Sequence, residues 1–174
     1  MRRLMLLRHG KTERPAPGGR DRDRRLTKRG CADVPLIGAY MAKRGLVPDL
    51  ALVSPARRTV ETWELVAACF AKPPQSASEE RIYNADAQRL IGLLCEPRGA
   101  RSLLVVGHNP GIHDLAVELI ASGDAKARAR VSEKLPTSGL VVIDLAFDDW
   151  SLLHPHAGRL ERFVSPRLLE KATE

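Results

Sequence analysis

Aromatic residues and long apolar runs are both scarce in this chain of 174 residues. Phe, Trp and Tyr together make up 4% of the sequence. The apolar segment at residues 4–7 is far too short for a signal peptide or a membrane span. Because aromatics are few and no helix-turn-helix, zinc-finger or RNA-recognition pattern occurs, nucleic-acid binding is not expected. The sequence therefore predicts a cytoplasmic protein that binds neither a membrane nor nucleic acid.

Cysteine is rare as well. Cys31, Cys69 and Cys95 make an odd number and lie at no metal-like spacing. We interpret them as reduced cytosolic thiols that are mostly buried. Since no cluster of carboxylates and histidines has ligand spacing either, neither a metal nor a cofactor is expected.

The apolar residues, 44% of the chain, are sufficient for a substantial core, and the length fits one domain spanning residues 1–174. Short apolar runs alternate with helical patterns, which predicts a three-layer α/β/α sandwich around a mostly parallel sheet. The expected strands are residues 4–7, 50–53, 81–83, 102–106, 139–145, 150–153 and 160–164. The expected helices are residues 28–44 capped by Thr27, 55–70 capped by Ser54, 87–94 capped by Asp86, and 112–121.

Positive charge is concentrated near the N-terminus. Residues 1–30 hold eleven Lys or Arg and three Asp or Glu, whereas residues 31–174 hold 17 and 18. The excess lies in the polar loop at residues 9–25, which also carries prolines and glycines. Such a loop is either a solvated surface or the mouth of an anion-binding site.

Three expected strands end in unusual polar residues. The first strand leads into Arg8 and His9, the second into a turn that carries Arg58, and the strand at 102–106 into His108. Ligands of parallel sheets bind beyond the carboxyl ends of the strands. A shared sheet edge therefore gathers two histidines and two or three arginines in one pocket.

Such a pocket suits phosphoryl transfer. Clustered cations repel one another unless an anion joins them. Arginine forms paired hydrogen bonds with phosphate oxygens, and its charge disfavours protonation of a neighbouring imidazole. A neutral histidine among arginines is then available to attack phosphorus, and the same cations stabilise the transition state.

The residues at these strand ends resemble the signature of the histidine phosphatase superfamily, branch 1, which includes phosphoglycerate mutases and many phosphatases. The matching segments, in the family's order, are Leu-Leu-Arg8-His9-Gly, Ser54-Pro-Ala-Arg-Arg58-Thr-Val-Glu-Thr62 and Val105-Val-Gly-His108-Asn-Pro. The resemblance implies a phosphoglycerate mutase-like fold and catalysis through a phosphohistidine enzyme intermediate. By position it implies that His9 is the nucleophile, that Arg8 and Arg58 hold the phosphate, and that His108 contacts the phosphoryl group.

Shorter details are similar to the bacterial phosphohistidine phosphatases within this superfamily. The segment Asp23-Arg24-Arg25-Leu-Thr-Lys-Arg-Gly30 carries this resemblance, together with Tyr83-Asn-Ala. It implies a phosphatase acting on phosphohistidine in a signalling protein of the histidine-phosphotransfer type. From the polar loop at residues 9–25, called the basic loop below, we add Arg24 and Lys11 as candidate phosphate-binding residues. We expect Ser138 to form a turn.

The sequence also departs from the mutases of the superfamily. Lys11-Thr-Glu-Arg-Pro15 stands where mutases carry a Trp-Asn pair, and Glu79 and Glu80 lack the surroundings of the mutase general acid. A phosphoramidate needs less help from an enzyme acid than an alkoxide leaving group does, which favours phosphohistidine. The alternatives are a small-molecule phosphatase, a mutase, or a non-catalytic module that binds phosphoproteins, and the general acid stays open.

Overall fold

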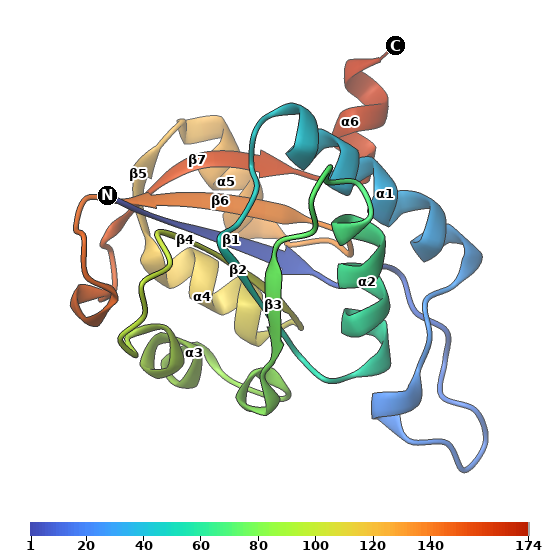
Figure 1. Cartoon of the computed structure of the whole chain (residues 1–174). Coiled ribbons are helices and arrows are strands. Elements are labelled where there is room, and N and C mark those ends of the chain that lie inside the picture. The colour runs from blue at the N-terminus through green and yellow to red at the C-terminus, as the bar shows by residue number, and fades with distance from the viewer. Residues whose placement is uncertain (174) are drawn as a thin grey trace.

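The computed structural model describes residues 1–173 and forms one seven-stranded sheet, with strand order β3-β2-β4-β1-β6-β7-β5 (Figure 1). The strands are β1 (Arg2–Arg8), β2 (Leu50–Val53), β3 (Gln75–Ser78), β4 (Ser102–Gly107), β5 (Ile120–Gly123), β6 (Leu140–Leu145) and β7 (Gly158–Val164). Strand β6 runs antiparallel to both of its neighbours, β1 and β7, while the other pairs are parallel. The prediction of a mostly parallel sheet is confirmed.

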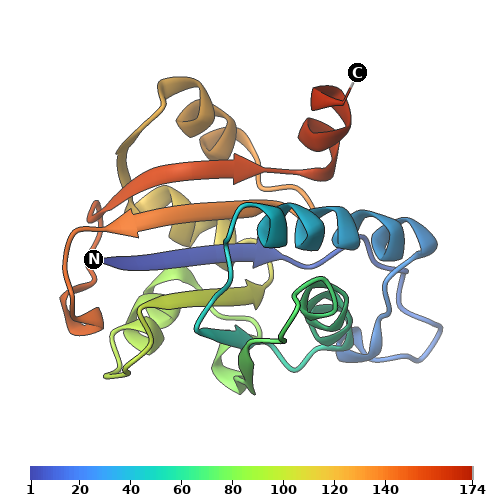
Figure 2. The same ribbon diagram turned by 45° about the horizontal axis from the view of Figure 1, so that its top comes forward.

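Helices cover both faces of the sheet, which gives the predicted α/β/α layers (Figure 2). One face packs against α3 (Ala87–Leu94), α4 (Gly111–Leu119) and α5 (Ala125–Glu133), and the other against α1 (Lys28–Lys43), α2 (Arg57–Ala67) and α6 (Pro166–Ala172). Within residues 1–173, no helix combines the length and the apolar character needed to cross a membrane.

Alternation along the central strands explains this layering. Successive side chains of a strand point to opposite faces. In β1, Leu4 and Leu6 belong to the core beneath α3 and α4, whereas Met5 and Leu7 belong to the core beneath α1 and α2. All four side chains are fully buried. A short apolar run without polar alternation is thus the pattern of a strand buried on both sides.

Two of the three predicted helix caps are confirmed. The Thr27 side chain accepts a hydrogen bond from the N–H of Gly30, and the Asp86 side chain accepts one from the N–H of Arg89. The prediction that Ser54 is the third cap is wrong, since α2 begins at Arg57 with Ala56 as its N-cap. The reason is that the N–H of Ser54 continues the β2 ladder by donating to the carbonyl of Val106.

The remaining errors lie in weakly patterned segments. Strands are predicted at residues 81–83 and 150–153, but the structure instead has the 3₁₀ helices Glu80–Ile82 and Trp150–Leu152, which overlap these ranges. Acidic residues explain both, because Glu79 and Asp149 accept hydrogen bonds from backbone N–H groups two residues on. The helix expected to reach residue 121 ends at Leu119, and β5 begins at Ile120. The sequence did not predict β3, β5, α5 or α6.

The cysteines also differ from expectation. All three are free thiols, as predicted. However, Cys31 is exposed and the other two are half-buried, so the prediction that they are mostly buried is wrong. Cys31 follows the buried Gly30 on the outer face of α1, where the helix turns its side chain toward solvent.

The carboxyl ends of β1, β2 and β4 meet at one edge of the sheet, as predicted. Arg8 pairs with Gly107 in register, and β2 pairs with β4 up to Val53. Because β6 runs in the opposite direction, its amino end reaches the same edge. There the N–H of Ser138 donates to the carbonyls of Arg8 and His9, and this bonding joins a fourth segment to the site.

Gly30 marks a close contact between α1 and the basic loop. A Cβ atom added at Gly30 meets the carbonyl oxygen of Lys11 at 2.4 Å. We therefore expect Gly30→Ala to lower the free energy of unfolding by about 1–3 kcal/mol, since a main-chain oxygen must move. Urea denaturation followed by circular dichroism measures this change.

Gly92→Ala is the matched control. Gly92 lies in α3, and a Cβ there meets no atom within 4 Å. The same substitution in this open helical position is expected to raise the free energy of unfolding by roughly 0.5–1 kcal/mol. Equal effects of the two substitutions contradict the close contact at Gly30.

Candidate active site

The structure brings all six predicted site residues to one hollow at the sheet edge. Its volume is about 550 Å³. The residues that line it are Arg8, His9, Lys11, Thr12, Asp21, Arg24, Arg58, Tyr83, Asn84, His108, Asn109 and Thr137. The neighbouring Arg57, which the sequence analysis left out, is exposed and pairs with Glu61 outside this hollow. The placement thus agrees with the sequence interpretation, while the roles of these residues stay predictions.

His9 follows β1 directly and is held in one orientation. Its side chain is 8% exposed, and its Nδ1 lies 2.8 Å from the carbonyl oxygen of Gly10. A carbonyl oxygen only accepts hydrogen bonds, so Nδ1 carries the ring proton. In the neutral ring the lone pair is therefore on Nε2, the atom a nucleophile needs.

The surroundings of His9 keep its ring neutral at physiological pH. Burial, followed by the charges of Arg8 and Arg58, lowers the pKa of His9 to about 4, although the hydrogen bond to Gly10 opposes this shift. From the sequence, the charges of the arginines are expected to keep this ring neutral. They act in the expected direction, but burial is the larger cause.

His108 follows β4 and lies beside His9. The two ring centroids are 5.4 Å apart with an interplanar angle of 54°. Its Nε2 is 2.7 Å from the Oγ of Ser54, the residue that follows β2. Burial and the charge of Arg58 lower the pKa of His108 to about 3, so this ring is also neutral. When the Ser54 hydroxyl donates to Nε2, Nδ1 carries the proton and can donate to an anion.

Arg58 is the most buried arginine of the site. The helix α2 places it with 6% of its surface exposed. Its Nη1 donates to the carbonyl of Asp21 at 2.8 Å, and its Nη2 donates to Oδ2 of Asp21 at 3.0 Å. These two bonds use one N–H of each terminal amino group, so three of the five N–H donors of Arg58 are not engaged by Asp21. Among them, the Nε–H is buried and has no hydrogen-bond partner.

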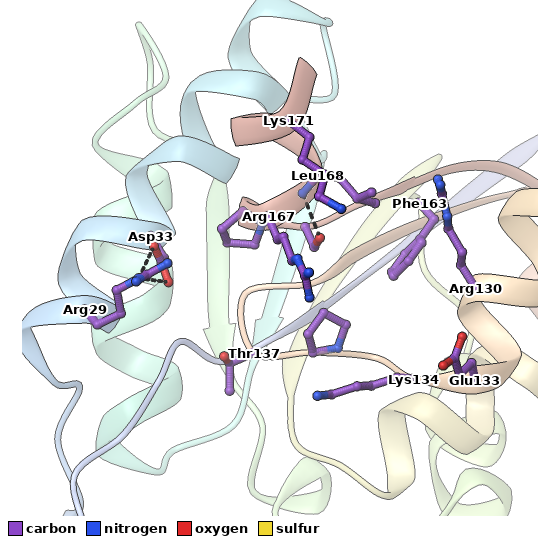
Figure 3. A pocket seen from close by; sticks show the side chains of 13 residues that line it. Arg29, Asp33, Arg130, Glu133, Lys134, Thr137, Phe163, Arg167, Leu168 and Lys171 are labelled. Carbon is purple, nitrogen blue, oxygen red and sulfur yellow. Dashed lines mark hydrogen bonds and ion pairs between the residues drawn. The ribbon is translucent and has the colours of Figure 1, made fainter. Parts of the chain in front are cut away.

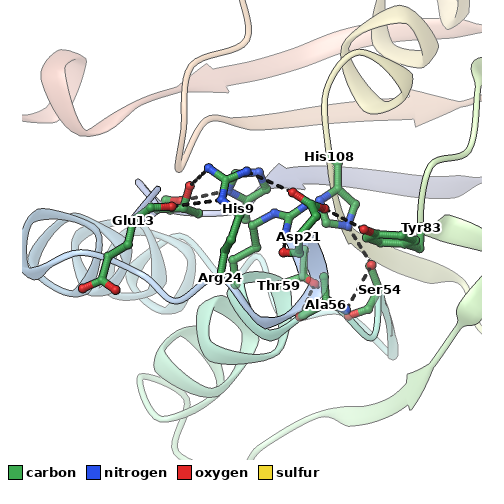
Figure 4. A network of polar contacts seen from close by, with 12 residues as sticks. His9, Glu13, Asp21, Arg24, Ser54, Ala56, Thr59, Tyr83 and His108 are labelled. Atoms are coloured by element: carbon green, nitrogen blue, oxygen red, sulfur yellow. Dashed lines mark hydrogen bonds and ion pairs between the residues drawn. The ribbon is translucent and has the colours of Figure 1, made fainter. Parts of the chain in front are cut away.

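Asp21 connects the basic loop to the site, as Figure 4 shows. Besides Arg58, its carboxylate accepts hydrogen bonds from Tyr83 Oη at 2.6 Å and Arg24 Nη1 at 3.1 Å. The bond from Tyr83 and those from both arginines hold the pKa of Asp21 well below its usual range, against the effect of burial. Asp21 is not among the predicted site residues, and its only signal in the sequence is that it is an acidic residue within a strongly basic loop.

The other two candidates from the basic loop differ in how firmly they are held. Arg24 also donates to Thr12 Oγ1 at 2.7 Å and to the carbonyl of Glu13 at 2.9 Å, so three hydrogen-bond partners fix its guanidinium. The Lys11 side chain is exposed at the rim of the hollow. Arg24 therefore sets the shape of the hollow, whereas Lys11 contributes charge at its mouth.

Buried polar atoms without partners gather in this site. Within residues 1–173, six buried side-chain nitrogen or oxygen atoms have no hydrogen-bond partner, and all but Arg2 Nε belong to the site. They are Arg8 Nε, Arg58 Nε, His108 Nδ1, Asn109 Oδ1 and Ser138 Oγ. Buried polar groups are rarely unpaired in folded proteins, and four of these five atoms can donate. Several unpartnered donors together with one buried and one half-buried arginine, Arg58 and Arg8, suit a tetrahedral oxyanion as ligand.

Ser138 illustrates a contribution that the sequence analysis described only in part. It forms the predicted turn, with a φ of 60°. Its hydroxyl is fully buried, and its N–H donates to the carbonyls of Arg8 and His9. The turn thus fixes the main chain on which the candidate nucleophile stands. No group of three or more His, Cys, Asp or Glu side chains within residues 1–173 is placed to hold a metal ion.

Comparisons with known proteins agree with this site. A family model for the histidine phosphatase superfamily (branch 1) matches residues 4–80, which include His9 and Arg58 but not His108. An uncharacterized protein of Mycobacterium tuberculosis is 34% identical over 164 residues, which cover 92% of this chain and all of that protein.

Solved structures of similar proteins share the whole fold. The SixA protein of Agrobacterium tumefaciens is 31% identical and has a TM-score of 0.81, over 95% of this chain and 98% of that one. The structure of the protein histidine phosphatase SixA complexed with tungstate is 25% identical and has a TM-score of 0.72, over 96% and 99% of the two chains. These similarities extend over β4 and β6, beyond the part that the family model matches.

The low pKa values of the two histidines depend in part on Arg58. We expect NMR titration of the imidazole C–H signals to give midpoints of about 4 for His9 and about 3 for His108. Arg58→Gln removes a charge that lowers both values, so both midpoints are expected to rise by roughly one pH unit. Burial keeps them below the ordinary value for histidine, about 6.5.

Arg57→Gln is the matched control, since it removes the same charge from the adjacent, exposed residue. It is expected to leave both midpoints where they are in the wild type. A His9 midpoint near 6.5 in the wild-type protein contradicts the proposed buried and neutral nucleophile.

Proposed function

This chain belongs to branch 1 of the histidine phosphatase superfamily, and from that premise we propose that it removes the phosphoryl group from phosphohistidine in a protein. His9 is the proposed nucleophile. The observation that carries the proposal is the state of its ring, which is buried, neutral and tied through Nδ1 to Gly10, with Nε2 left free among arginines. The tungstate in one similar structure supports an oxyanion as ligand, because tungstate is tetrahedral like phosphate.

In the first step, His9 Nε2 attacks phosphorus. A P–N bond to His9 forms while the P–N bond to the substrate ring breaks, and its electron pair stays on the substrate nitrogen. When the other nitrogen of that ring is protonated, the substrate leaves as neutral imidazole. The phosphorylated His9 ring is then a cation, and the carbonyl of Gly10, which accepts its Nδ1–H, stabilises this charge.

In the second step, water attacks the same phosphorus. The new O–P bond forms, the P–N bond to His9 breaks, and its electron pair returns to Nε2. The water proton goes to the released phosphate or to solvent. Arg8, Arg58 and His108 are the groups proposed to stabilise the oxygens of the transition state, since each has a buried and unpartnered nitrogen in the site.

The carboxyl groups near the site favour a leaving group that needs no enzyme acid. The pKa of Asp21 is well below its usual range, so this carboxyl group is ionised at neutral pH. Glu79 pairs with Arg81 and Glu80 pairs with Arg22, and both pairs lower the pKa of the glutamate. An alkoxide, as in phosphoserine, requires a proton that none of these three groups holds at neutral pH. Phosphohistidine does not, and this difference supports it over a phosphomonoester.

Phosphate release tests the proposal directly. We expect the wild-type protein to hydrolyse a phosphohistidine protein much faster than a phosphoserine peptide or a sugar phosphate. His9→Ala removes the nucleophile, so hydrolysis is expected to fall by at least about 1000-fold. Brief incubation with ³²P-labelled substrate is expected to leave an acid-labile, alkali-stable label on the wild type and none on the variant.

His154→Ala is the control for loss of a histidine, since His154 is exposed and outside the hollow. It is expected to retain full activity and the label. Faster turnover of the sugar phosphate makes the protein a small-molecule phosphatase with the same chemistry. Tight binding of the phosphoprotein without turnover makes it a binding module and overturns the proposed activity.

A further inference from the structure

A second hollow, here called the basic groove, lies beside the candidate active site. It has a volume of about 480 Å³ and is bordered by α1, α5, α6 and the segment that leads into β6 (Figure 3). Its cationic side chains include Arg130 and Lys134 at the end of α5 and Arg167 and Lys171 on α6. No sequence motif marked these residues, since α5 and α6 were not predicted.

The charge of the basic groove is largely uncompensated. Arg130, Lys134, Arg167 and Lys171 are exposed, and none of them forms an ion pair within residues 1–173. Two acidic residues also line the groove. Asp33 is already paired with Arg29. Of the acidic residues that line the groove, Glu133 therefore remains to balance the charge of the four cations. The groove therefore attracts negative charge.

The floor of the groove is partly apolar. Phe163, Pro136 and Leu168 are half-buried there, between the cationic side chains. Phe163 and Arg130 both line the groove, and Figure 3 labels both side chains. An occupant that carries only acidic groups leaves these apolar side chains exposed to water. A peptide segment with an apolar side chain among its acidic residues contacts both the apolar floor and the cationic side chains.

The groove and the candidate active site share one short segment. Thr137 lines both hollows. Just before it, the carbonyl of Leu135 accepts hydrogen bonds from Arg8 Nη1 and Asn109 Nδ2 at the site. Lys134, on the groove side, immediately precedes Leu135 in the chain. A macromolecule whose phosphoryl group occupies the site therefore passes close to the groove.

We infer that the basic groove binds an acidic segment of the phosphoprotein substrate, one that carries an apolar side chain among its carboxylates. The inference rests on the proposed function, because it concerns the protein part of that substrate. The groove adds affinity for the protein without contacting the phosphoryl group. Its effect is thus expected on KM for protein-like substrates and not on the chemical step.

Three phosphohistidine probes test the groove. They are free phosphohistidine, a phosphohistidine peptide flanked by Asp, Glu and one Leu, and the same peptide with Asn and Gln in place of the acids. We expect wild-type KM to be roughly 10-fold lower for the acidic peptide than for the neutral one. This preference is expected to shrink between 50 and 500 mM NaCl, since exposed charges are screened.

The double variant Arg130→Glu, Lys134→Glu reverses two groove charges and is expected to abolish the preference while leaving turnover of free phosphohistidine unchanged. The control Lys126→Glu, Arg128→Glu makes the same change at exposed positions of α5 outside the groove. It is expected to keep the preference. Equal KM values for the two peptides in the wild type, or equal losses in both double variants, overturn the inference.

Binding separates this inference from the proposed activity. Fluorescence anisotropy with the unphosphorylated acidic peptide measures the groove alone. If the wild type and the control variant bind this peptide and the groove variant does not, the result supports the groove. It does so even where no phosphohistidine probe is hydrolysed and the proposed function has failed. No binding of this peptide to the wild type, with normal hydrolysis of free phosphohistidine, overturns the groove and leaves the function standing.

Discussion

The hydrogen bond from His9 Nδ1–H to the carbonyl of Gly10 is the interaction on which the candidate site depends. It fixes the tautomer, and with it the nitrogen that holds a lone pair. The Gly10 main chain is in turn held by α2, because its N–H donates to Thr62 Oγ1, whose hydroxyl donates to the carbonyl of Arg58. The candidate nucleophile and an arginine of the candidate site are thus positioned by one continuous set of hydrogen bonds.

Charge balance is the second constraint. Arg8, Arg24 and Arg58 lie around a hollow that also holds two neutral histidines, and such a cluster is unfavourable without an anion. Asp21 supplies one carboxylate and binds two of these arginines. The same contacts anchor the basic loop, which explains why a polar segment rich in Pro and Gly packs against the site. The basic groove continues the positive surface beyond the candidate site, with Thr137 lining both hollows.

The predicted and unpredicted elements differ in how they are stabilised. Strands β1, β2 and β4 are buried on both faces, so their apolar runs were visible without any tertiary information. Helix α5 buries only Val131, and its apolar pattern is correspondingly weak. Ile82 and Tyr83 make the segment at 81–83 resemble a strand. However, the Glu79 side chain accepts a hydrogen bond from the N–H of Arg81, and this bond favours a 3₁₀ helix there.

The sequence by itself determined the layer order and the candidate residues that follow β1, β2 and β4, because local apolar patterns set the strands and parallel strands end at the same edge. Only the tertiary structure decided the partners of those residues. Asp21 meets Arg58 across 37 positions of sequence, Ser54 meets His108 across 54, and Leu135 meets Arg8 across 127. Such contacts depend on how loops fold back over the sheet edge. Neither a local pattern nor a short motif records that geometry, since each describes neighbours in the chain and not neighbours in space.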